Sequence, residues 1–306
     1  MKKFAEYLQS LRSQHELTQQ QMIDLLIDAD SSFERLDITT YSRWERGATE
    51  PKLAKQILVA RTFGDDVSLL FNNTLDSTEA KNIAFEEFIG PVFDPYWLGN
   101  HKITIHQTQL PSDDERSLAR IIAFNSNYLK LTCDEDLLVN ENITLTTVKD
   151  STGHLLGHHL FSFIPTDLPD ENLESNQVEK WSLTTLEKSS GNPINMYLIS
   201  GYNAIPEVRL ASLINMLHLL KEHQEIKYYI TNCHRHANYL MYDTHTECEI
   251  IARGVPISDG GVRLFGKRYS YVRLKIKAES ILAAKAILNL VPHTKAINDE
   301  NDHFQT

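Results

Sequence analysis

Apolar residues recur at helical spacing near the start of the chain. In Leu17–Leu26 they predict a helix, and Thr18 is its expected N-cap because a threonine hydroxyl can accept a free backbone N–H of the first turn. The apolar stripe expected to be buried consists of Met22, Leu25 and Leu26.

A second helix is predicted within Asp37–Gly47. Asp37 can cap its first turn, and Gly47 ends it where a left-handed residue is needed. Tyr41 and Trp44 lie one turn apart and are expected in the core. A third helical stretch follows and ends at Gly64.

From His101 onward the pattern changes to alternating strands and helices. Alternation with period two predicts half-buried strands, whereas helical spacing predicts amphipathic helices. The predicted strands are Lys102–Pro111, a hairpin over Ile143–Pro165 with its turn at Ser151–Gly153, Pro193–Ala204, Ile226–Cys233, Cys248–Ile257 and Val262–Ile276. The predicted helices are Ser112–Lys130 with Ser112 as N-cap, Glu207–Gln224 with Pro206 at its start, His234–His245 and Ala278–Val291, and the polar tail to Thr306 is expected to fray.

The runs LTQQQMIDLL and TTYSRWERGATEP together resemble the helix-turn-helix of the Cro/C1 (XRE) family of transcription factors. The resemblance covers about residues 1–70 and implies an all-α domain whose second helix meets base edges in the major groove. Arg43 can pair with guanine, and threonine methyl groups can touch thymine. The expected base-contacting residues are Ile38, Thr39, Thr40, Ser42 and Arg43. Thr18 and Gln19 match positions that hold phosphate in the family, and Lys52 is a third phosphate candidate.

The connection between these two helices is longer than the family's tight turn. The run IDADSSFERL separates Leu26 from Asp37. Either the first helix is extended or the turn holds an insertion.

Charge changes the expected strength of DNA binding. The chain of 306 residues has a net charge of −11, which counts against nucleic-acid binding, where a basic footprint is expected. The cations of the first domain nevertheless gather at and after the second helix, at Arg43, Arg46, Lys52, Lys55 and Arg61. We therefore expect salt-sensitive binding that relies on dimerisation for useful affinity.

The order of elements after His101 resembles that of the GNAT acyltransferase fold, including its acyl-homoserine-lactone-synthase-like relatives. This implies an α/β (α+β) domain with a mixed central sheet. In that family a glycine-containing loop cradles a pyrophosphate at the start of the long helix. Here Ala204–Ser212 has no glycine, and Glu207 places a negative charge there. A degenerate domain that senses a ligand or dimerises is therefore favoured over intact acetyl-CoA chemistry.

The resemblance also places a pocket between the strands Pro193–Ala204 and Ile226–Cys233, where this fold splays. The residues expected to line it are Arg209, Asn232, His234, Arg235 and Tyr239. If catalysis is retained, Glu249 is the candidate base, and Tyr239 or Tyr242 the candidate acid, although both tyrosines also suit an amphipathic core. No cofactor is expected; acyl-CoA or another acyl-bearing molecule is the ligand that the resemblance implies.

Two further clusters allow more than one interpretation. The basic run Arg263, Lys267, Arg268, Arg273, Lys275 and Lys277 suits an anionic ligand, DNA phosphate or a solvated strand face. Cysteines and histidines gather within Cys233–Cys248, and both suit zinc. Their spacing matches no zinc motif, so the cysteines are interpreted as buried residues and no metal site is predicted.

The sequence thus predicts a multidomain cytoplasmic protein. Three cysteines suit a reducing compartment, and no apolar run approaches the roughly 20 residues of a membrane helix. The expected parts are a helix-turn-helix domain in residues 1–73, an aromatic bridging segment in 74–100, a GNAT-like domain in 101–293 and a polar tail in 294–306.

The predicted function is a homodimeric transcriptional regulator. It would read double-stranded DNA at a two-fold site, and its second domain would sense a small molecule, dimerise, or both. One alternative is an active N-acyltransferase carrying a DNA-binding domain. Another is a protein-interaction module without DNA binding. No membrane partner is expected.

Overall fold

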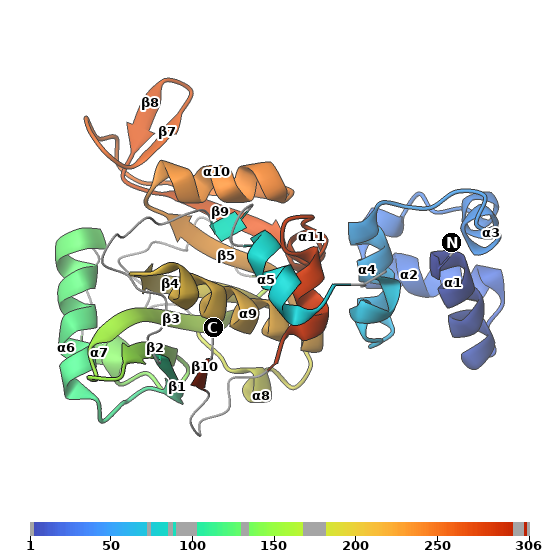
Figure 1. Cartoon of the computed structure of the whole chain (residues 1–306). Coiled ribbons are helices and arrows are strands. Elements are labelled where there is room, and N and C mark those ends of the chain that lie inside the picture. The colour runs from blue at the N-terminus through green and yellow to red at the C-terminus, as the bar shows by residue number, and fades with distance from the viewer. Residues whose placement is uncertain are drawn as a thin grey trace. The chain divides into compact units, whose positions relative to one another are not determined.

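A computed structural model shows two compact units, Met1–Thr74 and Leu75–Thr306 (Figure 1). The structure describes residues 3–71, 75–84, 88–89, 103–129, 135–167, 182–295 and 303–304. Most of the predicted aromatic bridging segment, and Cys133, lie outside the described residues. None of the described helices is long and apolar enough to span a lipid bilayer.

The first unit is helical throughout its described residues. Its elements are α1 (Lys3–Gln14), α2 (Gln19–Ala29), the 3-10 turn η1 (Ser31–Phe33), α3 (Ile38–Glu45), α4 (Leu53–Thr62) and the 3-10 turn η2 (Val67–Leu70). Tyr41 and Trp44 are buried, as predicted. The predicted stripe of α2 is wrong at one position: Leu25 is 44% exposed and Ile23 is buried in its place. Around the helix Leu26 lies between Met22 and Ile23, whereas Leu25 lies at the edge of this stripe, on the side away from Ile23.

The long connection between α2 and α3 combines both predicted alternatives, an extended first helix and an insertion in the turn. α2 continues to Ala29, and η1 then fills the turn. Asp30 caps η1 by accepting the backbone N–H of Ser32 at 2.7 Å, and the fully buried ring of Phe33 anchors it.

The second unit is a mixed α/β structure built on a large sheet. Its helices are α5 (Ser77–Ala84), α6 (Glu115–Phe124), the π-helical turn η4 (Asn125–Leu129), α7 (Glu135–Leu138), α8 (Leu186–Ser189), α9 (Pro206–Glu222), α10 (His236–His245), α11 (Ala278–Leu282) and the 3-10 helix η7 (Leu288–His293). Its strands are β1 (Ile103–Gln109), β2 (Thr144–Asp150), β3 (Leu155–Pro165), β4 (Ile194–Asn203), β5 (Ile226–Cys233), β6 (Cys248–Arg253), β7 (Val262–Leu264), β8 (Lys267–Tyr269), β9 (Val272–Lys277) and β10 (His303–Phe304).

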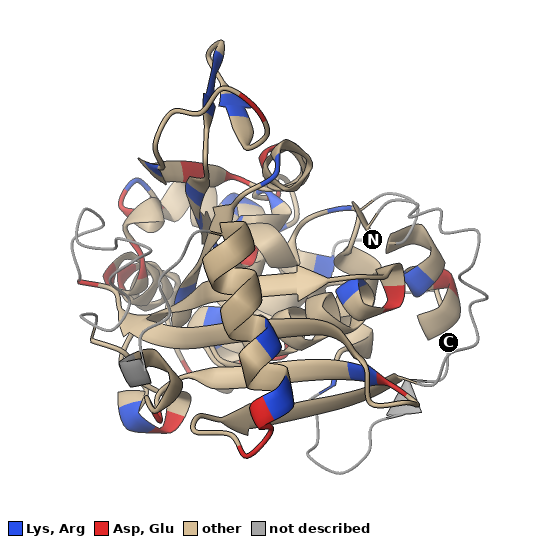
Figure 2. Ribbon diagram, turned by 90° about the vertical axis from the view of Figure 1, so that its left-hand side faces the viewer, with Lys and Arg blue, Asp and Glu red and all other residues tan. Residues whose placement is uncertain are grey.

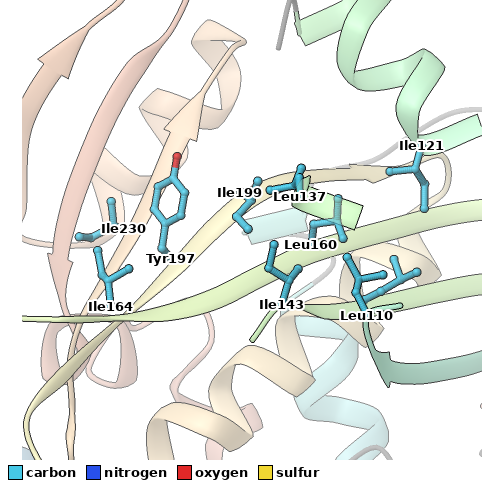
Figure 3. Packing of buried hydrophobic residues seen from close by; sticks show 10 residues of the cluster. Leu110, Ile121, Leu137, Ile143, Leu160, Ile164, Tyr197, Ile199 and Ile230 are labelled. Atoms are coloured by element: carbon cyan, nitrogen blue, oxygen red, sulfur yellow. The ribbon is translucent and has the colours of Figure 1, made fainter. Parts of the chain in front are cut away.

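Eight of these strands form one sheet in the order β10-β1-β2-β3-β4-β5-β9-β6. β4 and β5 pair in parallel because α9 carries the chain back between them, whereas the other neighbours pair antiparallel. The buried cluster in Figure 3 packs side chains of β2, β3, β4 and β5 against Ile121 of α6 and Leu137 of α7. On the sheet, α9 packs against β3 and β4.

Four details of the predicted elements are wrong. The predicted strand Val262–Ile276 is three strands, because Phe265 and Gly266 adopt positive φ and turn the chain into the β7–β8 hairpin. The predicted last helix stops at Leu282. Asp114, and not Ser112, caps α6 by accepting the N–H of Ser117. Within the tail, β10 pairs with β1.

Candidate functional site

The first candidate site is the outward face of α3. Asp37 caps this helix by accepting the N–H of Thr40 at 2.6 Å, and this hydrogen bond lowers the pKa of the carboxyl group. Ile38, Thr39 and Arg43 are exposed, whereas Thr40 and Ser42 are half-buried. The face therefore offers an apolar side chain, hydroxyl groups and a guanidinium group to solvent.

The expected phosphate-binding residues have different surroundings. Thr18 forms a capping box with Gln21: its hydroxyl accepts the N–H of Gln21 at 3.2 Å, and its own N–H is donated to the side chain of Gln21 at 2.8 Å. Gln19 is half-buried and donates its side-chain amide to Glu45. Lys52 is exposed at the start of α4. Contact with DNA remains a prediction for all three.

One predicted member of the basic cluster does not reach the surface. Arg61 is 3% exposed in α4, where its neighbours on the helix are also buried. Its placement in a DNA-facing group of cations was therefore wrong. The sequence pattern missed this because arginine is rarely buried so completely.

The second candidate site is a cavity of about 420 Å³ in the second unit. It lies where β4 and β5 separate: their pairing ends at Leu198 and Thr231, but β4 continues to Asn203 alongside β3. Side chains from β4, β5, α6, α9 and α10 line it. A cavity of this volume suits a small organic ligand.

An irregularity in β4 lies at the same place. The register with β3 passes from Leu160 opposite Ser200 to Phe161 opposite Leu198, so Ile199 is an inserted residue with no opposite neighbour on β3. Such a bulge locally frees the backbone from the ladder. β4 therefore loses its regular pairing with both neighbouring strands at the wall of the cavity.

The charge of the cavity lining is one-sided. The described residues that line it include Arg209 and Arg235 but no aspartate or glutamate. Arg209 donates to the backbone carbonyl of Ile89 at 3.4 Å, and Arg235 donates to the Tyr128 hydroxyl at 2.8 Å. Neither arginine forms an ion pair within the described part of the chain. An anion is therefore attracted to the lining.

The remaining lining combines apolar and aromatic side chains with polar ones. Its apolar members are Phe88, Ile89, Phe124, Leu129, Phe161, Met196, Leu198, Ile199, Leu213, Met216, Ala237 and Met241. Ser200 lies among them. Its hydroxyl is buried and has no hydrogen-bond partner among the described residues. A buried hydroxyl without a partner costs about 1–3 kcal/mol, a cost that a polar group of a ligand would offset.

Two histidines in the lining are neutral at physiological pH. Burial lowers the pKa of His159 and of His234 to about 4. The ring of His159 lies over Gly201, where a Cβ atom would come within 2.6 Å of its Cδ2. The neighbouring Cys233 is not an activated thiol, since burial raises its pKa to about 12.

A buried arginine lies behind the lining. Arg273 is 1% exposed, and its Nε donates to the side-chain oxygen of Asn232 at 2.9 Å. Asn232 in turn donates to the Tyr197 hydroxyl at 2.9 Å. This chain of hydrogen bonds fixes the amide of Asn232 in the cavity wall, and it shows that Arg273 does not belong to a solvated basic face.

The structure brings together most, but not all, of the predicted ligand and catalytic residues. Arg209, Asn232, His234, Arg235 and Tyr242 line the cavity. Tyr239 does not: it is buried, its hydroxyl donates to Asp243 at 3.0 Å, and burial raises its pKa to about 12, which makes it a weaker acid. Glu249 is exposed on the edge strand β6, away from the lining.

The sequence pattern missed Tyr128, His159 and Ser200. None of them lies in a recognisable sequence motif, and only the cavity connects them. At the start of α9, the first turn carries Glu207 and no glycine.

Among the described residues, no group of three or more His, Cys, Asp or Glu side chains is placed to hold a metal ion.

No protein-family model and no curated protein matches the chain. Solved structures that are similar include the AHL synthase LasI, with 12% identity, 61% of this chain and 96% of that chain covered, and a TM-score of 0.36. FeeM, an N-acyl amino acid synthase from uncultured soil microbes, has 12% identity, 62% and 98% coverage, and a TM-score of 0.36. TofI in an apo form has 12% identity, 58% and 94% coverage, and a TM-score of 0.36. At these sequence identities and TM-scores the similarity is distant, and it assigns no function to this chain.

Proposed function

We propose that the second unit is a GNAT-like acyltransferase domain that binds an acyl donor with an anionic end and transfers the acyl group to an amine. The observation that carries this proposal is the cavity at the bulge of β4, whose described lining combines an apolar part, two arginines and no carboxylate. An acyl chain suits the apolar part, and the anionic end of the donor suits Arg209 and Arg235. Acyl-CoA and other acyl carriers have this combination of groups.

In this proposal the bulge positions the reacting carbonyl. Backbone N–H groups around Ile199 and the hydroxyl of Ser200 donate to the carbonyl oxygen, where negative charge develops during acyl transfer. The amine nitrogen forms a bond to the acyl carbon, and the bond from that carbon to the leaving thiolate breaks. The neutral imidazole of His159 accepts the proton that the amine loses and returns it to the leaving group.

The test combines binding and turnover. The full chain is titrated calorimetrically with acyl-CoA esters of increasing chain length, and free thiol is followed in the presence of a mixture of amines. Arg209→Gln is expected to weaken binding of all donors, whereas Leu198→Trp is expected to weaken long chains more than short ones because it fills the cavity. Arg116→Gln, at an exposed arginine of α6, is the control.

The outcomes separate an enzyme from a sensor. Binding with thiol release supports acyl transfer, and binding without release identifies a domain that only senses the donor. If wild type binds no acyl ester, or if Arg209→Gln and Leu198→Trp bind like wild type, the cavity is not an acyl site.

A second function is supported by the exposed face of α3. We propose that the first unit is a Cro/C1-like helix-turn-helix that binds duplex DNA in the cytoplasm as a homodimer. Ile38, Thr39 and Arg43 point to solvent from a well-capped helix, as a base-reading helix requires. A ligand of the second unit would then regulate DNA binding if it has different affinities for two arrangements of the protein.

DNA selection tests this function. Bound duplexes are selected from a random pool, and the selection is repeated with Arg43→Ala. Loss of the arginine is expected to reduce sequence discrimination by about 1–3 kcal/mol, whereas Lys52→Ala should weaken all duplexes alike. Undiminished discrimination by Arg43→Ala would show that α3 does not read the bases.

A further inference from the structure

The β7–β8 hairpin carries an unusual concentration of positive charge. Residues 253–271 contain Arg253, Arg263, Lys267 and Arg268 but a single acid, Asp259, in a chain whose net charge is −11. Figure 1 shows the hairpin projecting from the sheet, and Figure 2 shows its Lys and Arg positions on the projecting ribbon.

The register of the hairpin places two of these cations side by side. Arg263 lies directly opposite Arg268 on the paired strands. Val262 and Leu264, which flank Arg263, are buried, so the two arginines share the outer face of the ribbon. Like charges directly opposite each other destabilise an antiparallel pair, and a bound anion would offset that cost.

The cations are available for binding. Arg263 and Lys267 are exposed, and neither side chain forms a hydrogen bond or ion pair within the described part of the chain. Arg268 donates to the carbonyl of Gly260 at 3.0 Å, which steadies its guanidinium group on the loop.

An aromatic residue occupies the tip. Phe265 is 89% exposed and has φ of +48°, a left-handed conformation that is uncommon for a residue with a side chain. The guanidinium carbon of Arg253 lies 5.9 Å from the Phe265 ring centre and 5.9 Å from the Tyr269 ring centre. These contacts hold a further cation beside the exposed ring.

We infer that the β7–β8 hairpin is a second DNA-contacting element, separate from α3, that binds the phosphates of a duplex. A two-stranded ribbon fits a DNA groove. The paired arginines bind phosphates on its outer face, and Lys267, which is exposed beside the turn and lies opposite Leu264, binds a further phosphate. Phe265 packs against the sugars or wedges at a base step, as apolar side chains do in architectural DNA-binding proteins. The inference does not depend on acyl transfer.

The experiment uses the full chain and a fluorescently labelled duplex of mixed sequence. Binding is measured by anisotropy over a range of salt concentrations in a background of Arg43→Ala and Lys52→Ala, which removes two expected contacts of the first unit. Arg263→Gln with Lys267→Gln is expected to reduce the slope of log affinity against log salt by about 2, one for each lost phosphate contact. Phe265→Asn, which tolerates positive φ, is expected to weaken binding at all salt concentrations and to leave the slope unchanged.

Arg116→Gln with Lys188→Gln, two exposed cations elsewhere in the second unit, is the matched control and should bind like its background. Circular dichroism verifies that each variant is folded. The inference is overturned if the hairpin variants bind the duplex like the control, or if the background protein binds no duplex at low salt. Binding to anionic vesicles without binding to the duplex would likewise overturn it, in favour of a membrane surface.

Discussion

Glu45 is the residue on which three helices of the first unit converge. It is 4% exposed, and its carboxylate accepts from Arg12 Nε at 2.6 Å and from the Gln19 side chain, while Gln9 donates to its backbone carbonyl at 2.6 Å. Arg12 belongs to α1, Gln19 to α2 and Glu45 to α3. This buried carboxylate therefore fixes the orientation of the exposed face of α3.

Glu45→Gln is expected to destabilise the first unit by about 2 kcal/mol, because hydrogen bonds to a charged group contribute about that much. The partial exposure of Arg12 limits the loss, since its guanidinium can turn to water. Amide hydrogen exchange in α1–α3 of the full chain would measure this loss of stability. Glu50→Gln, at an exposed position, is the control. Equal protection in both variants would contradict the role given to Glu45.

His158 makes the stability of the second unit dependent on pH. The residue is 2% exposed beneath the ring of Phe124, and burial with the neighbouring His159 lowers its pKa to about 3. The unfolded chain therefore binds a proton below about pH 6.5 that the folded chain does not bind. Stability is fully present above that pH and falls as the pH decreases toward the folded pKa.

The expected loss is up to about 1.4 kcal/mol per pH unit from His158 alone. Urea unfolding from about pH 7 to about pH 4.5 would show a shallower pH dependence for His158→Asn than for wild type. Phe124→Leu alters the same ring contact without removing a titrating group, so it should lower stability at every pH and keep the wild-type slope. The same slope in His158→Asn and wild type would refute this account.

At the level of elements, the packing of α9 on the sheet depends on one glycine of β3. A Cβ atom at Gly157 would lie 2.5 Å from Val208 Cγ1 and 2.8 Å from the backbone oxygen of Tyr202. The second contact is with backbone of β4, which cannot move aside cheaply. Gly157 thus allows β3, β4 and the start of α9 to approach closely.

Gly157→Ala is expected to cost about 1–3 kcal/mol, the usual range for overpacking a well-filled interior. It should also weaken any ligand of the cavity, because β4 and α9 form two of its walls. Urea unfolding and ligand titration would measure the two effects. Ser151→Ala, in the exposed hairpin turn, is the control. A stability equal to that of the control would mean that α9 can shift freely on the sheet.

The regular strands and helices were predictable from sequence because their pattern of apolar and polar residues matches the pattern of buried and exposed positions. β1, β3, β5 and the long helix α9 lie close to their predicted positions. The bulge at Ile199 was not predictable, since one inserted residue leaves the composition of a strand unchanged. The β7–β8 hairpin was also missed, because VRL, RYSY and VRLKI each alternate, and only Gly266 between them is a turn residue.

The position between the strands Pro193–Ala204 and Ile226–Cys233 was implied by the resemblance to the GNAT fold, and the residues that line the cavity were predicted only in part. Arg209 and Arg235 were predicted because they flank the splayed strands. Ser200 and His159 were not, since a residue that faces a cavity and one that faces a filled core have the same sequence pattern. Tyr239 shows the converse error: a position suggested by the family resemblance is occupied by a side chain that bonds within its own helix.

At the scale of the whole molecule, the division into Met1–Thr74 and Leu75–Thr306 predicts that the second unit folds by itself. A fragment of residues 75–306 is expected to unfold cooperatively and to bind the same ligands as the full chain, because the described lining of the cavity comes entirely from this unit. Circular dichroism and calorimetric titration of the fragment would measure both properties. A fragment that is unfolded, or that has lost binding, would show that residues 1–74 complete the second unit.

The strand order of the sheet has a consequence for synthesis of the chain. β9 lies between β5 and β6, although β6 precedes it in sequence. Antiparallel neighbours β1 to β4 can pair as they leave the ribosome, and β5 can then join β4 through α9. β6 has to wait, because its partner Val272–Lys277 has not yet been made. The open edge of β5 is therefore a place where a nascent chain is exposed to mispairing, and a pause in translation before β9 would prolong that exposure.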